Sequence, residues 1–405
     1  MKRRSTGLAA GAAVFALAVL LVRSWRIDYP YSIDFQTYWL AGSRVLHGEA
    51  GKLYEPGGGE PAGLPASLAA SEFKNMPIVA VAFAPFGAAP YLPAKRAFWW
   101  LSLGALFATA WVAGRWLVPE AVGPVAARCL GAFAVIAVMA PTHTALRHGQ
   151  TTPFVALLVA VWWALLVRGR AAWAGAALAG ACLIKFPPFA LLALDALRAR
   201  WRAVGACLGA LAGVGLLSVV LFGPALHRIY ASGVLEQGGQ VMTGHNNQSL
   251  TATVTRVFEP VPLNDWTPRP APPAATWALR LVALVLAVGA GFHMRKVRDL
   301  SLTRLPYEGL AASALGVVVL PVAWDHYFLL LAPGMIAAGA ALMVRGERGL
   351  LFGLGAAYVL IGVPTPAAWL ERASTSGAVD GLLVSHYFVG AVVAIVVALV
   401  ALRRA

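Results

Sequence analysis

Long apolar runs recur along almost the whole chain, and they restrict the fold more than any other feature. A stretch of about 20 apolar residues crosses a bilayer as a helix, because only helices and closed barrels satisfy all their backbone polar groups without water. The sequence is 60% hydrophobic and 12% charged, which is more apolar than a soluble core requires. We therefore predict an all-α polytopic membrane protein that forms a single integral membrane domain over residues 1–405.

The apolar runs suffice for roughly twelve crossings, several of which are short for a bilayer. A basic start, Lys2-Arg3-Arg4, precedes the first run as in a signal peptide, but no small-residue cleavage site follows, so we expect a retained anchor. The expected spans are residues 7–22, 97–117, 125–140, 153–167, 171–184, 188–197, 203–222, 276–292, 307–322, 327–344, 350–363 and 382–402.

Basic residues outnumber acidic ones, 32 against 17, and they gather at the ends of apolar runs. This is the positive-inside pattern of membrane proteins, and it argues against a nucleic-acid partner. With Lys185 placed outside, the basic clusters all fall on the cytoplasmic side, which predicts a multi-pass protein of the cell inner (cytoplasmic) membrane with both termini in the cytoplasm. These clusters are Arg168/Arg170, Arg198/Arg200/Arg202, Arg295/Lys296/Arg298/Arg304, Arg345/Arg348 and Arg403/Arg404.

Two large loops are expected on the outer, periplasmic face, at residues 24–96 and 223–275. In the first loop, Asp34 is a candidate N-cap of a short helix, ending near residue 46, that lies in the membrane interface. Residues 76–92 are apolar but interrupted by prolines, which favours a re-entrant or surface-packed segment, and whether they cross the membrane stays open. The end of the second loop is rich in proline, which favours an extended spacer.

Five polar clusters fall on this same outer face. Asp34 stands near aromatic side chains, where a carboxylate could accept a hydroxyl proton, although a plain helix cap is the alternative. Lys185 would cost on the order of 2.5–3.5 kcal/mol at mid-membrane, so it either snorkels to the interface or holds an anion such as a lipid phosphate. The remaining clusters, for which loop or helix-end roles are the alternatives, are Arg147-His148-Gly149-Gln150, His245-Asn246-Asn247-Gln248 and Trp324-Asp325-His326-Tyr327.

These stretches together resemble glycosyltransferase family 87, the polyprenyl-phosphate-sugar-dependent transferases of the GT-C superfamily. Its best-known members are mannosyltransferases of the bacterial cell envelope. The resemblance implies a GT-C-type bundle with short interfacial helices in the first outer loop and an active site on the outer face. It also implies a polyprenyl-phosphate sugar as donor and a glycolipid or glycan as acceptor. The segments that carry it are residues 34–39, 46–48, 53–54, 148–150, 175–187, 247–250 and 324–327.

By position, the resemblance makes Asp34 the general base of an inverting single displacement. Lys185 and His326, with Arg147, would face the donor phosphate. A polyprenyl phosphate is a good leaving group that cationic side chains can neutralise, so neither a metal ion nor a cofactor is expected. The residues expected near the sugar or the acceptor are Tyr38, Gln150, His245, Asn246, Asn247, Gln248 and Asp325.

Two other classes of protein remain as alternatives at this point. A transporter or lipid flippase would use broken helices such as the one interrupted at Lys185-Phe186-Pro187-Pro188 to bind cargo at mid-membrane. We find no internal repeat of the kind that transporters usually have. A scaffold without catalysis would leave Asp34 as a helix cap.

Overall fold

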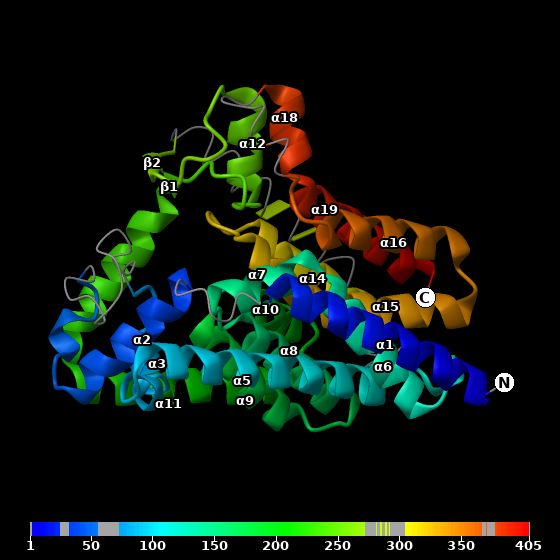
Figure 1. Cartoon of the computed structure of the whole chain (residues 1–405), viewed down its shortest axis with the longest axis horizontal. Helices are drawn as coiled ribbons and strands as arrows, with labels where there is room; N and C mark the ends of the chain where they lie inside the picture. The colour runs from blue at the N-terminus through cyan, green and yellow to red at the C-terminus, as the bar shows by residue number, and fades with distance from the viewer. Residues whose placement is uncertain are drawn as a thin grey trace.

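The computed structural model describes residues 2–24, 32–55, 73–271, 304–366 and 377–404, with isolated positions between 281 and 291 and at 370. The described residues are almost entirely helical, which confirms the predicted all-α membrane class (Figure 1). The first helices are α1 (Lys2–Ser24), α2 (Ile33–Leu46), η2 (Ala50–Lys52), α3 (Pro77–Val81), α4 (Ala84–Gly87), α5 (Tyr91–Val112), η4 (Ala113–Leu117), η5 (Glu120–Val122), α6 (Val125–Val138), α7 (Ala140–His148), α8 (Thr152–Val167), α9 (Ala171–Ile184) and α10 (Phe189–Leu197). The later ones are α11 (Trp201–Gly238), α12 (Leu250–Phe258), α14 (Leu305–Val318), η6 (Asp325–Leu331), α15 (Ala332–Arg345), α16 (Arg348–Gly362), α18 (Ala378–Val384) and α19 (His386–Arg404).

Sheet is confined, in the described ranges, to an antiparallel pair of two-residue strands and an isolated bridge. Strands β1 (Gln240–Val241) and β2 (Arg269–Pro270) pair within the second large loop, next to the end of α11.

Five helices of the described chain are long and apolar enough to cross a membrane, and the bent pair α6 and α7, which meet at 69°, would make a sixth. Four shorter apolar helices, α8, α9, α14 and α16, supplement them. Most of the span expected at 276–292, the basic residues at 295–298 and most of the glycine-rich part of the first loop lie outside the described residues.

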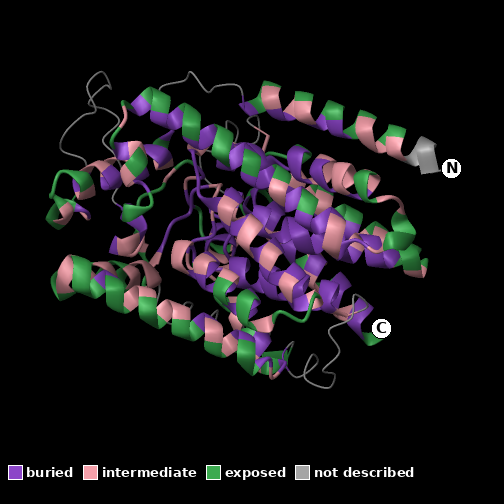
Figure 2. Ribbon diagram, turned by 90° about the horizontal axis from the view of Figure 1, so that it is seen from below, coloured by how far each residue is buried: buried purple, intermediate pink, exposed green. Residues whose placement is uncertain are grey.

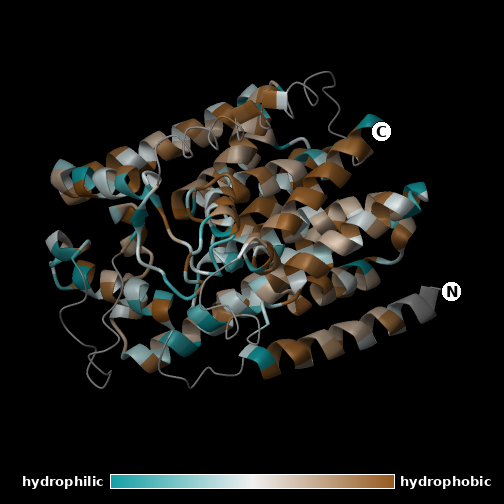
Figure 3. Cartoon of the chain, turned by 90° about the horizontal axis from the view of Figure 1, so that it is seen from above, coloured by the Kyte–Doolittle hydropathy of each residue, from teal (hydrophilic) through white to brown (hydrophobic). Residues whose placement is uncertain are grey.

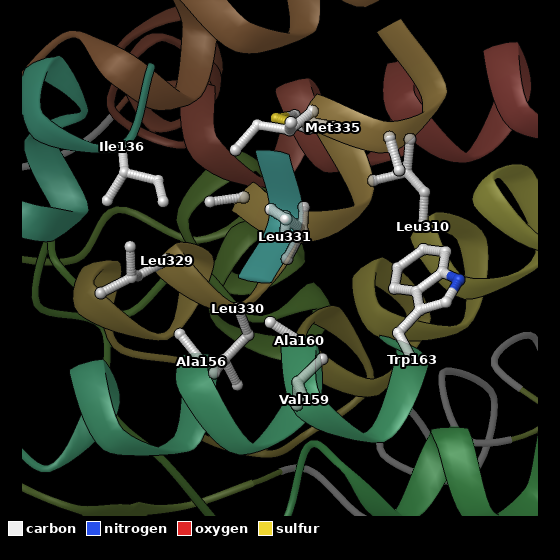
Figure 4. Packing of buried hydrophobic residues seen from close by; sticks show 14 of the residues in the cluster. Ile136, Ala156, Val159, Ala160, Trp163, Leu310, Leu329, Leu330, Leu331 and Met335 are labelled. Carbon is white, nitrogen blue, oxygen red and sulfur yellow. The ribbon is translucent and has the colours of Figure 1, made fainter. Parts of the chain in front are cut away.

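The core lies where α8, α14, η6 and α15 pack together (Figure 4). Trp163, Leu310 and Leu331 are fully buried there. Figure 2 shows buried residues concentrated in these central helices, whereas the outer helices expose one face. The outward faces of α1 and α11 are apolar (Figure 3), with Leu8, Phe15 and Leu216 more than two thirds exposed, as expected for helices bordered by lipid.

Helix α11 is interrupted at the residue where the second loop was expected to begin. The expected span ends at residue 222, and Gly223 then has non-helical backbone angles, with φ at 76° and ψ at 161°. Few residues other than glycine tolerate such a positive φ, and Pro224 cannot donate a backbone hydrogen bond. A second helical segment follows and ends at Gly238, so the first part of the second loop is helical.

The helices that the structure describes in the first loop pack closely against one another and against α5. Residues 76–92 form α3 and α4 before α5 begins at Tyr91, which fits the expectation of a proline-broken segment. Helix α2 crosses α4 so closely that a Cβ on Gly42 would lie 2.1 Å from the Phe83 carbonyl oxygen. The α2 face beside it is aromatic: Phe35 stacks on Phe98 with 4.9 Å between ring centroids, and Tyr38 on Phe83 with 4.6 Å. This buried face fastens α2 to the protein.

Ion pairs form both on the surface and in the interior of the described chain. Arg404 reaches Glu347 at 2.9 Å on the surface. In the interior, Glu308 of α14 lies 2.9 Å from Arg198 and 3.5 Å from Arg200. Asp195, expected to pair with a neighbouring arginine, contacts Arg200 at 2.9 Å and accepts a hydrogen bond from Trp162. In Figure 1, α2 lies toward the side of the molecule opposite the two labelled termini.

Candidate active site

The beginning of α2 and the end of α7 are held together residue by residue. The sequence predicted Asp34 as the N-cap of α2, but the helix begins at Ile33 and Ser32 is its N-cap, so Asp34 stands in the first turn. The Ser32 hydroxyl donates to the carbonyl oxygen of Arg147 at 3.0 Å. Asp34 is thus not needed as a cap, and its carboxylate remains one quarter exposed.

Gly149 makes this approach possible. It ends α7 in the left-handed conformation, with φ at 68°, and a Cβ on it would lie 2.4 Å from the Phe35 Cβ. Only glycine fits both demands. As a result, His148 faces Asp34, with 3.6 Å between Nδ1 and Oδ2.

Lys185 lies in the turn that follows α9, and its side chain is buried near the start of α2. Its Nζ donates to Gln150 Oε1 at 3.0 Å, and the Tyr38 hydroxyl reaches the same oxygen at 3.5 Å. The ammonium also sits 4.3 Å from the centroid of the Tyr327 ring. Burial lowers the pKa of Lys185 to about 7, while the nearby Asp34 carboxylate opposes that shift. Lys185 is therefore a poorly neutralised buried cation beside a carboxylate.

Helix η6 brings the next pair of candidates to the same place. Asp325 accepts hydrogen bonds from the Thr144 hydroxyl at 3.2 Å and from the backbone N–H of His326 at 2.7 Å. His326 is 3% exposed, and its Nδ1 lies 3.5 Å from Asp325 Oδ1. Neither ring nitrogen makes a well-formed hydrogen bond within the described chain. A buried imidazole in that state has bonding capacity left for a ligand.

The 245–248 segment reaches the site through its backbone. The backbone N–H of Asp325 donates to the carbonyl oxygen of Asn246 at 2.9 Å, which ties this loop to η6. The Asn246 side chain accepts from Trp266, and the His245 ring lies edge-on to that indole. Both side chains are thus near the site but already contact Trp266, elsewhere in the second loop.

Asn247 and Gln248 are buried, and their amide groups bond to the protein itself. Asn247 donates to the Met242 carbonyl and accepts from the backbone N–H groups of Ser249 and Ala323. Gln248 donates to the carbonyl oxygens of His245 and Val384 and accepts from two backbone N–H groups at the start of α19. In this structure the two amides hold the loop against η6 and α19.

The structure thus gathers Asp34, Tyr38, Gln150, Lys185 and the Asp325-His326 pair around one point. Arg147, predicted to bind phosphate, has an exposed side chain, and its backbone carbonyl makes the contact with α2. Asn246 and His245 border the group, while Asn247 and Gln248 support it from beneath.

Sequence reasoning passed over three residues that matter here. His148 belongs to one of the predicted polar clusters but has no role in the sequence-based prediction, although it is the side chain that faces Asp34. Asn75 donates to the Ile184 carbonyl at 2.8 Å and so anchors the turn that carries Lys185. Arg256 is fully buried, donating to the carbonyl oxygens of Thr243, Gly244 and Asn247 and to the Ser385 hydroxyl. An arginine in the last turn of a short amphipathic helix gave no local signal of these partners.

This arrangement combines a carboxylate that is about one quarter exposed with a buried ammonium and an imidazole that still has bonding capacity. A carboxylate of this kind can accept a proton from a hydroxyl group. An ammonium and an imidazole N–H can stabilise the negative charge that develops on a departing phosphate. The site is therefore suited to transfer of a group from a phosphate to a hydroxyl.

Comparison with known proteins agrees with this chemistry. The model of glycosyltransferase family 87 matches residues 73–333, well over half of the chain. The matched range includes Gln150, Lys185 and His326, whereas Asp34 and Tyr38 precede it. No curated protein sequence matches the chain. On the strength of the family match, the chain belongs to glycosyltransferase family 87 and is a membrane glycosyltransferase.

Proposed function

We propose that the protein transfers a sugar, mannose in the first instance, from a polyprenyl-phosphate donor to an acceptor hydroxyl at the outer, periplasmic face of the inner membrane. The acceptor would be a glycolipid or glycan of the cell envelope. The observation that carries the proposal is the meeting of Asp34 with Lys185 and His326 at one end of a helical membrane bundle. Family membership favours this reading over a transporter or a scaffold.

In the proposed reaction, Asp34 accepts the proton of the acceptor hydroxyl as the oxygen attacks the anomeric carbon. The bond from that carbon to the phosphate oxygen breaks, and its electron pair leaves with the polyprenyl phosphate. Because a single displacement occurs, the configuration at the anomeric carbon inverts.

Each remaining side chain takes a role from its position. Lys185 and His326 bind the donor phosphate, since both are buried and the imidazole has no well-formed partner in the described chain. Arg147, exposed at the rim, adds positive charge for the incoming phosphate. Tyr38, Gln150 and Asp325 border the sugar, and the loop at 245–248 borders the acceptor.

The donor class is tested with purified protein in lipid nanodiscs. We expect transfer from polyprenyl-phosphomannose with no nucleotide sugar present, and a product of inverted anomeric configuration by NMR. Transfer from a nucleotide sugar alone, or retained configuration, would contradict the proposed mechanism. Polyprenyl-phosphate donors that carry other sugars, used in parallel, establish which sugar is preferred.

The proposed orientation is tested separately by cysteine labelling in intact cells. Glu49→Cys, in the first loop, is expected to react with a membrane-impermeant maleimide, and Arg348→Cys only after lysis, because both positions are exposed. Cys182 and Cys207 are buried and Cys129 is half-buried, so the labelling of each variant is compared with that of the wild-type protein. The reverse labelling pattern would place the site on the cytoplasmic face.

A further inference from the structure

Three successive residues at the end of α7 contact the start of α2. The carbonyl oxygen of Arg147 accepts a hydrogen bond from the Ser32 hydroxyl at 3.0 Å, and His148 lies 3.6 Å from Asp34. Gly149 packs directly against Phe35, where no larger residue would fit. Two of these three contacts involve backbone atoms. The backbones that carry His148 and Asp34 are therefore held at fixed positions, so the contact between the two side chains follows from the fold.

His148 has acidic neighbours on two sides. On α2 it faces Asp34, and from η6 the Asp325 carboxylate is close enough to interact with it electrostatically. The other charged groups of the site are Lys185, which is engaged by Gln150 and the Tyr327 ring, and His326, which lies beside Asp325. The side chains of His148 and Asp34 are 27% and 28% exposed, so an acceptor can still approach the carboxylate.

We propose that His148 is a positioning residue for the general base, an inference that rests on the proposed function of Asp34. The Nδ1–H of His148 donates to Oδ2 of Asp34 and holds the carboxylate at a fixed rotation. Oδ1 is left free to accept the acceptor proton, while the acceptor oxygen bonds to the anomeric carbon and the phosphate leaves. The distance of 3.6 Å in the free enzyme shortens to a hydrogen bond when substrate is bound, as catalytic contacts commonly do.

The loss of transfer rate expected without His148 can be judged from the hydrogen bond that it donates to the Asp34 carboxylate. Removing a hydrogen bond to a charged group slows a reaction that depends on it by about 10- to 100-fold. The loss falls on kcat, because His148 orients the base and does not touch the donor phosphate in this proposal. The KM for the donor stays within about twofold of the wild-type value, since an interaction absent from ground-state binding leaves KM unchanged.

The test compares His148→Leu, which removes the donor, with His148→Asn, whose side-chain amide places an N–H near the position of Nδ1. Sugar transfer is measured in nanodiscs with protein amounts matched by tryptophan fluorescence. His148→Leu is expected to lose 10- to 100-fold in kcat, and His148→Asn to recover at least tenfold of that loss. His47→Leu, an exposed histidine at the other end of α2, is the matched control and is expected to behave as wild type.

Each other outcome overturns the inference. Wild-type kcat in His148→Leu would mean that Asp34 needs no partner. Equal loss in the Leu and Asn variants would mean that the imidazole acts as a proton acceptor or by its shape and not as a hydrogen-bond donor. His148→Phe, which keeps a ring without the nitrogen, replaces the Leu variant if that variant does not fold. Wild-type protein that transfers no sugar would refute the proposed function itself, a result distinct from these.

Discussion

The charge of Lys185 gives the most quantitative prediction of the proposed mechanism. Its ammonium is buried and donates a hydrogen bond to the neutral amide of Gln150, and its pKa is lowered to about 7 mainly by desolvation. In the free enzyme Lys185 is therefore charged below pH 7 and increasingly neutral above it. A neutral amine cannot pair with a phosphate, so the donor should bind best below pH 7.

The magnitude follows from the loss of a single proton. The kcat/KM for the donor reports the free enzyme, and it should fall about tenfold per pH unit once the pH is well above 7, or about 100-fold between pH 6 and pH 9. Bound phosphate favours the charged form, so kcat at saturating donor should change less over the same range.

The assay measures initial rates of sugar transfer from pH 6 to pH 9 with wild type, Lys185→Arg and Lys185→Met. The Arg variant should lose the descending limb, because a guanidinium stays charged throughout this range. The Met variant should be slower by about 10- to 150-fold, the equivalent of a charged hydrogen bond, and should also lack that limb. A flat wild-type profile, or the same decline in Lys185→Met, would refute the assignment of Lys185 to the phosphate.

Two further predictions concern stability. Gly149→Ala should lower the free energy of unfolding by about 1–2 kcal/mol for the left-handed backbone and by about 1–3 kcal/mol more for the overlap with Phe35. Gly169→Ala, with a similar φ of 70° and open space around it, should cost only the first of these amounts. Thermal unfolding measures both losses, and equal losses would refute the packing argument. Glu308→Gln should destabilise the protein by about 3–5 kcal/mol, because it removes the carboxylate that Arg198 and Arg200 share. The surface control Glu347→Gln should cost under about 1 kcal/mol. Similar melting temperatures for the two variants would contradict the stabilising role of the buried network.

The class of fold could be predicted from the sequence because hydropathy acts locally. Apolar runs between basic clusters are sufficient to indicate a helical membrane protein, and most expected helices lie within a few residues of those observed. The break in α11 at Gly223-Pro224 agrees with the end of the span expected at residue 222, but the helical segment that follows and ends at Gly238 was not predicted within the second loop. The N-cap of α2 is Ser32 and not Asp34, and the sequence around Asp34 gives no sign of the contact between the Ser32 hydroxyl and α7.

The polar clusters of the site could be named from the sequence because each interrupts an apolar pattern. Their division of roles could not, because it depends on contacts between distant segments. Nothing near Asn247 indicates that its amide is engaged by Met242, Ser249 and Ala323. His148, in contrast, looks like an ordinary helix-terminal residue until α7 and α2 are seen together.

The central claim is that Asp34 is the base of a polyprenyl-phosphate-dependent glycosyltransferase, and Asp34→Asn tests it most directly. The variant keeps the size and the first-turn position of the side chain but removes the charge that accepts the proton. In matched nanodiscs, we predict that it binds polyprenyl-phosphomannose as wild type does and transfers sugar at least about 100-fold more slowly, the lower end of the range for general base catalysis. Transfer at the wild-type rate would contradict the claim and leave Asp34 as a structural residue of α2.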